Sequence, residues 1–425
     1  MKVELFITKR LAAGGGKSFS RFISRIATAA VALSLAVMIV SLAMVNGFQR
    51  EISNKIFGFW GHVYITQFGF GRSFENNVSI TYGQANVGMI RKMPNVARVE
   101  GFAYKPCIMK TSDQLDGLVL KGLAQTYDWH FFAAHLVSGQ VPTFQKEEEF
   151  SRDILISRIT ARRLQLKVGD DIDLHFLQNS ALPQIRRMKV SGIYNTGMEE
   201  YDALYALVDI RMIQQLNQWG ADEVSGFEVF LKSYESNRLT AAFQSGLDAT
   251  PINEVAEYIN SEVLGPELSA QTIMQVNPNI FDWLSLQNTN KWVILGLMAV
   301  VALVNMTTCL LILILERTNM IGILKALGAQ DWTIRMIFVY QAVFIVAIGL
   351  VIGNAIGIGI CLAQAQWGLI TLPEESYYVS KAPIDLNWAS VAVLNIITLL
   401  LCFLVLLFPS WLVSSIAPVK AIRFS

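Results

Sequence analysis

The pattern of charged and apolar positions divides the chain at four long runs that contain no Asp, Glu, Lys or Arg. These runs cover residues 26–49, 292–315, 336–373 and 386–419. A membrane-spanning helix needs about 20 consecutive apolar residues, and four such runs in one chain are not typical of buried helices in a soluble protein. The pattern therefore predicts membrane-spanning helices over 24–46, 292–315, 336–362 and 389–413.

A cleaved signal peptide is the alternative for the first run, because six Lys and Arg residues precede it within residues 1–25. The apolar core of this run is about 20 residues, longer than the ~7–15 of a signal peptide, and no small-x-small cleavage site closes it. The sequence favours an uncleaved helix.

The distribution of basic residues predicts the orientation in the membrane, because cytosolic loops are enriched in Lys and Arg. Residues 1–25 hold six basic residues and one acidic residue, and loop 316–335 holds three basic and two acidic residues. Loop 363–388 holds one basic residue, Lys381, and three acidic residues. We expect the cytosolic parts to be the basic N-terminus 1–23, loop 316–335 and tail 414–425, and the outer parts to be the domain 47–290 and loop 363–388.

Composition agrees with a membrane protein. Hydrophobic residues make up 53% of the chain and charged residues 16%, against roughly 25% charged in an average soluble domain. The net charge of +1 excludes a nucleic-acid binder that works by bulk positive charge, and the composition excludes a disordered chain. Cys107 is the single cysteine between residues 47 and 290, so no disulfide framework is possible there.

The outer segment 47–290 has the alternating patterns of a mixed α+β domain. A helix ending at Ile90 precedes two strands that are split by a turn over 112–116, and 226–231 reads as a strand. Further helices are predicted near 235–244 and 254–263, with a strand over 270–275. Between these parts, short strands over 154–157, 172–177 and 187–194 and a helix over 159–164 predict an inserted β-rich lobe at about 150–220.

Catalytic chemistry is not indicated by any motif. The Gly-rich stretch 14–18 lacks the earlier glycine of a phosphate-binding loop, because position 11 is Leu11, and His130 and His135 have no metal-ligand partners at helical spacing. No ionisable residue lies in the middle of a predicted span, which disfavours an ion-coupled transporter. We expect no metal and no cofactor on this chain, and an energy source on another subunit.

Three glycines in the third predicted span recur every four residues: Gly349, Gly353 and Gly357. Small residues at this spacing form a smooth helix face that allows a second helix to approach closely in lipid. We expect this face to pack against another helix.

The loop after the second span contains a short amphipathic helix. Residues 316–329 read ERTNMIGILKALGA, in which Met320, Ile323, Leu324 and Leu327 share one face. Gly328 ends the helix, and Lys325 lies in its last turn. The pattern alone fits a helix on the membrane surface and a helix docked into a soluble partner equally well.

The four-span topology and this loop resemble the FtsX/MacB-like type VII ABC permease superfamily. The segment from FITKR through SRFISRIATAAVALSLAVMIVSLAMVNGFQREISNKIFGFWGHV resembles the start of the lipoprotein-releasing permeases, the LolC/LolE family. LKVGDDIDL and VSGIYNTGMEEYD resemble their inserted lobe, and PSWLVSSIAPVKAIRF resembles their C-terminal end.

The resemblance implies a membrane protein with four transmembrane α-helices and a large periplasmic α+β domain between helices 1 and 2, in which a porter-like lobe carries the inserted β-rich lobe. It implies a non-catalytic permease of the bacterial inner membrane that extracts lipoproteins by mechanotransmission. A LolD-like ATPase would hold ATP and Mg²⁺, and a second permease copy would complete a homodimer or a paralogous heterodimer. The coupling helix would use Glu316, Arg317, Met320, Ile323, Leu324, Lys325, Leu327 and Gly328. A MacB-like export permease and an FtsX-like signalling subunit are the alternatives.

A hairpin that hooks a LolA-like periplasmic carrier in one family member matches residues 178–186 here. The candidate contacts are Leu182, Pro183, Gln184 and Arg186. The hairpin is shortened, and Asp173 stands where that member has a basic residue. A LolE-like role without direct carrier capture, or a homodimer that performs both roles, therefore stays open.

The outer end of the first span carries large apolar residues on one face: Val40, Met44 and Phe48. Phe281, Trp283 and Leu284 come just before the second span, on the same side of the membrane. Met and bulky apolar side chains suit acyl chains of varied shape. We interpret the six residues either as ordinary helix–helix core or as the lining of a cavity for the acyl chains of a lipoprotein.

Overall fold

A computed structural model describes residues 18–68, 78–111, 114–144, 149–176, 184–232 and 250–410, without the side chains of 18–21, 375 and 406–410. The expected N-terminal segment 1–17, the helix near 235–244, the carrier candidates Leu182 and Pro183 and the tail from residue 411 lie outside the described residues.

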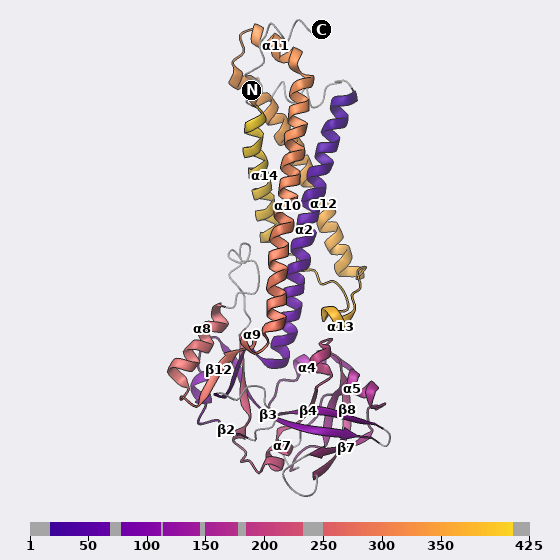
Figure 1. Cartoon of the computed structure of the whole chain (residues 1–425), viewed down its shortest axis with the longest axis vertical. Helices are drawn as coiled ribbons and strands as arrows, with labels where there is room; N and C mark the ends of the chain where they lie inside the picture. The colour runs from indigo at the N-terminus through magenta and orange to yellow at the C-terminus, as the bar shows by residue number, and fades with distance from the viewer. Residues whose placement is uncertain are drawn as a thin grey trace.

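Four long helices form an elongated bundle that stands on a sheet-containing domain (Figure 1). In the described part of the chain, these helices are long and apolar enough to cross a membrane. They are α2 (Ser18–Trp60), α10 (Pro278–Glu316), α12 (Asp331–Trp367) and α14 (Trp388–Ser410).

Helices α2 and α10 continue without a break from the bundle into the sheet-containing domain (Figure 1). The expected boundaries of the outer domain at 47 and 290 therefore fall inside helices. The expected boundaries were placed where charged residues reappear in the sequence. The helices continue beyond these points because Ile52, Ile56 and Ile280 are buried in a cluster beside the sheet.

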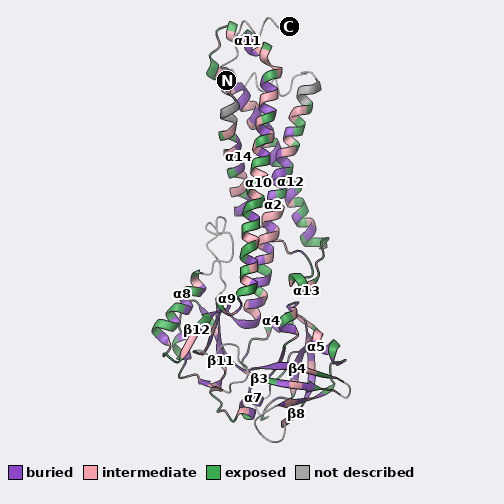
Figure 2. Ribbon diagram, viewed as in Figure 1, coloured by how far each residue is buried: buried purple, intermediate pink, exposed green. Residues whose placement is uncertain are grey.

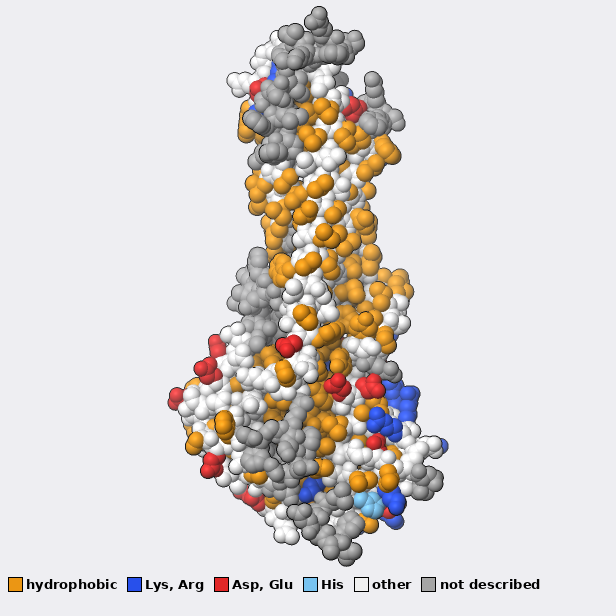
Figure 3. Space-filling model, viewed as in Figure 1, with side chains coloured by type: hydrophobic (Ala, Val, Ile, Leu, Met, Phe, Trp, Pro, Cys, Tyr) orange, Lys and Arg blue, Asp and Glu red, His pale blue; other side chains and the backbone are white. Residues whose placement is uncertain are grey.

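The bundle has a narrow buried core and a largely apolar outer surface. Buried residues lie along the centre of the helices, and exposed residues lie on their outer faces (Figure 2). Apolar side chains cover the visible surface of the bundle, whereas charged side chains gather on the sheet-containing domain (Figure 3). This is the distribution expected for helices surrounded by lipid.

The sheet-containing domain is built on one continuous hydrogen-bonded path, β12-β1-β11-β3-β4-β9-β6-β8-β5, with β7 pairing both β3 and β8. A separate pair joins β10 to β2. The strands are β1 (Val63–Gln67), β2 (Ile80–Thr81), β3 (Val96–Lys110), β4 (Leu115–Leu123), β5 (Leu136–Gly139), β6 (Asp153–Ser157), β7 (Asp171–Phe176), β8 (Gln184–Tyr194), β9 (Tyr205–Asp209), β10 (Glu223–Val224), β11 (Gly226–Leu231) and β12 (Leu268–Thr272).

Short helices accompany the strands. Helix α8 packs against β1 and β12, and the π-helical turn η1 follows α8 directly. The short helices are α3 (Val87–Ile90), α4 (His130–Ala134), α5 (Arg158–Arg163), α6 (Glu199–Asp202), α7 (Ile210–Asn217), α8 (Thr250–Tyr258), η1 (Ile259–Val263), α9 (Ile273–Val276), α11 (Thr318–Ala326) and α13 (Glu374–Tyr377).

The long strand β3 belongs to two lobes. The first lobe contains β12, β1 and β11, and residues 96–102 of β3 pair with β11 there. The second, β-rich lobe contains β7, with which residues 108–110 of β3 pair. Strands β3, β4, β9, β6, β8 and β7 close into a barrel, because β7 returns to β3. The β-rich lobe thus includes β3 and β4 and is larger than the expected 150–220, since local alternation identifies strands but not their partners.

Most strands in the segments that showed a clear alternation lie where the sequence predicts them, and β11 has the predicted bounds. The strand expected over 270–275 is partly wrong. The strand ends at Thr272, whose hydroxyl accepts a hydrogen bond from the Gln275 amide in a capping box that starts α9.

A buried lysine joins α2 to the sheet. Lys121 of β4 donates a hydrogen bond to the carbonyl oxygen of Phe59 in the last turn of α2, at 2.6 Å, and forms a 2.7 Å ion pair with Glu228 of β11. Both charged side chains are fully buried. Burial lowers the pKa of Lys121, which the neighbouring Glu228 carboxylate opposes. A cation at a helix C-terminus stabilises the exposed carbonyl groups, so Lys121 fixes the end of the helix on the sheet.

Candidate functional site

The residues expected to contact an ATPase lie at the end of the bundle opposite the sheet-containing domain (Figure 1). Helix α11 follows α10 after a turn at Arg317, and both Glu316 and Arg317 are half-buried. Gly328, with φ +87°, adopts the left-handed conformation that ends the segment. The short helix is therefore held between α10 and α12.

The apolar stripe of α11 does not form one exposed face. Met320 and Leu324 are partly buried against the core of the bundle, next to the fully buried Ile321. Ile323 and Leu327 are 51% and 79% exposed. Met320 and Leu324 therefore already contact the bundle, and the expectation that all four side chains contact a partner stays a prediction.

Lys325 also holds the loop rather than projecting from it. Its side chain is 10% exposed and forms a 3.0 Å ion pair with Asp331, in the first turn of α12. The ion pair ties the end of α11 to the start of α12. Only four residues, 327–330, separate the end of α11 from the start of α12.

The glycine face of α12 lies directly against α2. A Cβ atom at Gly349 would lie 2.9 Å from Val31, at Gly353 2.7 Å from the Ala32 carbonyl oxygen, and at Gly357 3.1 Å from Ala36. The partner helix belongs to the same chain. The close approach of α12 and α2 therefore requires the absence of side chains at these three positions.

The residues of the expected acyl-chain cavity lie where α2 and α10 run side by side. Val40, Met44, Phe48, Phe281 and Trp283 are half-buried, whereas Leu284 is buried in the core. The two helices are joined there by polar contacts. Gln49 donates to the Leu284 carbonyl oxygen at 3.2 Å, and Lys291 donates to Asn46 at 3.2 Å. Leu284 is thus part of the core between the helices of one chain, and the other five side chains are partly accessible.

The described part of the carrier-loop segment begins at β8. Gln184 is its first residue, and both Gln184 and Arg186 are half-buried. Asp173 of β7 forms a 2.9 Å ion pair with Arg187 of β8, which holds the pKa of the Asp173 carboxyl below its usual range. Asp173 therefore stabilises the pairing of the two strands at the base of this segment.

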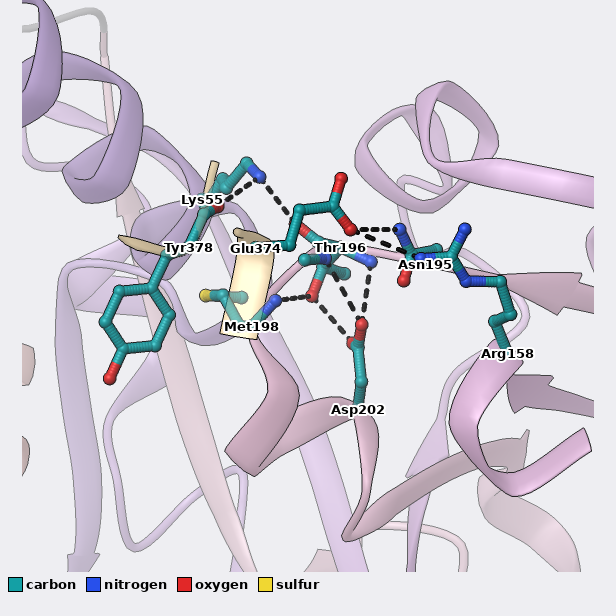
Figure 4. Close-up of polar contacts among 9 residues, drawn as sticks. Lys55, Arg158, Asn195, Thr196, Met198, Asp202, Glu374 and Tyr378 are labelled. Atoms are coloured by element: carbon teal, nitrogen blue, oxygen red, sulfur yellow. Dashed lines mark hydrogen bonds and ion pairs between the residues drawn. The ribbon is translucent and has the colours of Figure 1, made fainter. Parts of the chain in front are cut away.

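A polar junction connects the loop between α12 and α14 to the β-rich lobe (Figure 4). We call residues 368–387 the strap. Glu374 of the strap accepts hydrogen bonds from Arg158 of α5 at 3.2 Å and from Asn195 at 3.4 Å. Lys55 of α2 lies between the two parts and donates to the carbonyl oxygens of Tyr378 at 2.8 Å and Thr196 at 2.6 Å.

The lobe side of this junction is a tight turn organised by Asp202. Its carboxylate accepts hydrogen bonds from the Thr196 amide and hydroxyl at 3.0 and 2.6 Å and from the Gly197 amide at 3.2 Å. Gly197 has φ +76°, a conformation that favours glycine. Burial raises the pKa of Asp202 to about 6, although the hydrogen bonds favour its charged form. The turn thereby presents the Thr196 carbonyl to Lys55.

Replacing Asp202 with alanine should lower stability by about 2 kcal/mol, because two buried amide groups and a hydroxyl lose their acceptor. The folded-state pKa lies above the unfolded value of about 3.9, so the carboxyl contributes stability at low pH that is lost as the pH rises through 6. The deficit of Asp202→Ala should therefore widen from pH 7 to pH 5. Thermal unfolding of the purified protein measures it, with the exposed Glu200→Ala as control. A deficit that narrows at pH 5 would contradict this account.

Sequence reasoning did not identify the residues of this junction or of the buried ion pair. The segment VSGIYNTGMEEYD, which includes Asn195, Thr196 and Asp202, supported only a family resemblance. In the sequence, Lys121 and Glu228 each stand as a charged residue within an otherwise apolar strand, which is the signal that could have indicated a buried ion pair. Their partners are far apart in sequence, so the pairing is visible only in the folded chain.

Two protein families match successive parts of this chain. Residues 24–257 match the family described as MacB-like periplasmic core domain, and residues 292–418 match the FtsX-like permease C-terminal family. The lipoprotein-releasing system transmembrane protein LolC of Xylella fastidiosa is 24% identical over 421 residues, which cover 96% of this chain and 95% of that protein.

Two further similarities extend the comparison. The lipoprotein-releasing system transmembrane protein LolE of Haemophilus influenzae is 23% identical over 437 residues and 99% of each chain. The solved periplasmic region of MacB from Actinobacillus actinomycetemcomitans is 13% identical with a TM-score of 0.35, covering 55% of this chain and 98% of that structure. The LolC and LolE proteins thus match nearly the whole length of the chain rather than a single domain.

Proposed function

We propose that this chain, which belongs to the LolC/LolE family of FtsX/MacB-like permeases, is the permease subunit of an ABC transporter that releases lipoproteins from the bacterial inner membrane. The full-length similarity to proteins named LolC and LolE supports this assignment. ABC permeases of this kind are non-catalytic, so a separate LolD-like subunit binds ATP and Mg²⁺ and hydrolyses the nucleotide.

The orientation follows from the distribution of basic residues. The sheet-containing domain and the strap lie in the periplasm, and α11 and both termini lie in the cytosol. The ATPase docks on the exposed side chains of Ile323 in α11 and Leu327 at its C-cap. A second permease copy, identical or paralogous, completes the transporter, and a LolA-like carrier accepts the lipoprotein in the periplasm.

The observation that carries this proposal is the continuity of α2 and α10 between the two ends of the molecule. A helix transmits displacement along its axis, and the Lys121 contact fixes the end of α2 in the sheet. Movement imposed by the ATPase at α11 therefore reaches the periplasmic domain as a rigid-body motion. The transporter thereby performs mechanical work on its substrate.

A photo-crosslinking amino acid at Met44 or Phe48 tests the function. In the nucleotide-free complex these positions should capture a lipoprotein through its acyl chains, and trapping with ATP and vanadate should remove the product. Val351, which is exposed on α12, serves as a control at which nucleotide should make no difference. Crosslinks from Met44 and Phe48 to the partner permease alone, in both nucleotide states, would contradict the cavity. Capture of a different class of substrate would favour a MacB-like exporter.

A further inference from the structure

We propose that the strap is a second transmission path from the coupling helix to the periplasmic domain, and that Glu374 is the positioning residue that connects the path to the β-rich lobe. This inference rests on the proposed function. The first path is the stalk, which is formed by α2 and α10. The second path runs through α12, which is paired with α14, and through the strap. Four sets of contacts support it.

Helices α12 and α14 are fixed to each other by a pair of asparagines. Asn354 and Asn395 exchange two hydrogen bonds, of 2.7 and 3.0 Å. Each side-chain amide also donates to a carbonyl oxygen one turn earlier on its own helix, Leu350 or Val391, at 2.8 Å. All four amide hydrogens are therefore used in an apolar setting, where an unpaired amide is costly. The pair fixes the register of the two helices, so they move together.

The strap is fixed to the end of α12. Gln364 donates hydrogen bonds to the carbonyl oxygens of Ile370 and Ala382, at 3.2 and 3.1 Å, and accepts one from the Ile370 amide at 2.8 Å. Thr371 and Lys381 form an isolated β-bridge across the strap. The two arms of the strap are thereby joined to each other and to the helix, which makes the strap an extension of α12.

The returning arm of the strap lies on α2. The Asp385 amide donates to the Ala43 carbonyl oxygen at 3.0 Å, and the Asp385 carboxylate lies 3.4 Å from Arg50. A Cβ atom at Gly47 would lie 2.4 Å from the Pro383 carbonyl oxygen, so only glycine allows this approach. The strap is therefore seated on the stalk between the bundle and the lobe.

The tip of the strap contacts the lobe directly through Glu374, and Tyr378 is connected to Thr196 of the lobe through Lys55 of α2, as Figure 4 shows. The Arg158 and Glu374 side chains are 37% and 32% exposed, so their ion pair is only partly screened by solvent. At its opposite end, α12 is separated from α11 by four residues. A displacement of α11 thus passes through α12, the strap and Glu374 to Arg158 of α5 and to Asn195. Lys55 of α2 adds a second contact between the strap and Thr196.

Charge reversal in the purified permease–ATPase complex tests the path. Arg158→Glu places two carboxylates at the junction and should lower the lipoprotein released per ATP by about threefold to tenfold. The rate of ATP hydrolysis should be unchanged, because α11 is untouched. The double variant Arg158→Glu with Glu374→Arg restores opposite charges and should recover most of the release. Arg162→Glu, at an exposed position on the same helix, is the matched control and should behave as wild type.

A second readout does not depend on the substrate. Hydrogen exchange of residues 195–202 should change when ATP and vanadate trap the wild-type complex, and this change should be lost in Arg158→Glu and regained in the double variant. Wild-type behaviour of Arg158→Glu in both measurements, or a loss that the double variant does not recover, would overturn the inference. A wild-type complex that releases no lipoprotein but shows the exchange response would overturn the proposed function and leave the path supported.

Discussion

Aspartate at both Ile323 and Leu327 should abolish association of the permease with its ATPase. Ile323 of α11 and Leu327 at its C-cap are large exposed apolar side chains, with 51% and 79% of their surface accessible in the isolated chain. Burying such a side chain in a partner contributes about 1.5–3 kcal/mol, so loss of both weakens binding by at least a hundredfold. Co-purification of the ATPase with the affinity-tagged permease from membranes measures the effect.

Two other positions on α11 sharpen this test. Asn319→Asp also adds a carboxylate at an exposed position of the helix, and it should leave the ATPase bound. Met320→Asp replaces a residue that packs on the bundle, so it should lower the yield of folded permease as well as ATPase binding. Retention of the ATPase by the Ile323 and Leu327 double variant would show that the partner binds elsewhere.

Leucine at Gly353 should prevent the permease from folding to its normal yield. The Cβ atom alone would lie 2.7 Å from the Ala32 carbonyl oxygen and 3.0 Å from the Leu35 Cβ atom. Backbone atoms cannot move aside as a flexible side chain can, so α12 must separate from α2. We expect a loss of about 4 kcal/mol or more, since overpacking is added to the loss of helix contact. Yield and thermal unfolding in detergent measure the result.

Gly359 provides the matched control on the same helix. A Cβ atom there meets nothing within 4 Å, so Gly359→Leu should give normal yield and stability. Gly353→Ala should fall between the two, because the first side-chain carbon already overlaps the Ala32 carbonyl. Equal behaviour of the leucine variants at 353 and 359 would be incompatible with the observed packing of α12 on α2.

The apolar runs and the alternating strands were readable from the sequence because both depend on near neighbours. A long run without charged residues is buried away from water whichever element it packs against, and the apolar positions of a strand with one buried face recur every two residues. The glycine spacing on α12 was informative for a similar reason, since three small residues on one helix face indicate close approach. The choice of α2 as the helix that lies on this face was not contained in the spacing.

Some features misled the sequence interpretation because a second element changes what a local pattern means. Met320, Ile323, Leu324 and Leu327 share one apolar face in the sequence pattern, yet Met320 and Leu324 are partly buried against the bundle, whereas Ile323 and Leu327 are exposed. The sequence beyond residue 47 has the composition of a soluble domain, yet α2 remains helical to Trp60 and α10 begins already at Pro278. Both helix ends persist because their apolar side chains are buried beside the sheet. Helix ends and exposed faces were therefore decided by packing.

By itself the sequence determined that the chain has four apolar runs long enough to cross a membrane, a mixed α+β pattern between the first two and a short amphipathic segment after the second, because hydrophobicity and its period are local properties. Only the tertiary structure decided how these parts are connected. Strand β3 serves both lobes, Lys121 pairs with Glu228, and the strap reaches Arg158 across more than 200 positions of sequence. Such contacts depend on which distant groups the fold brings within hydrogen-bonding distance, and no local pattern encodes that distance.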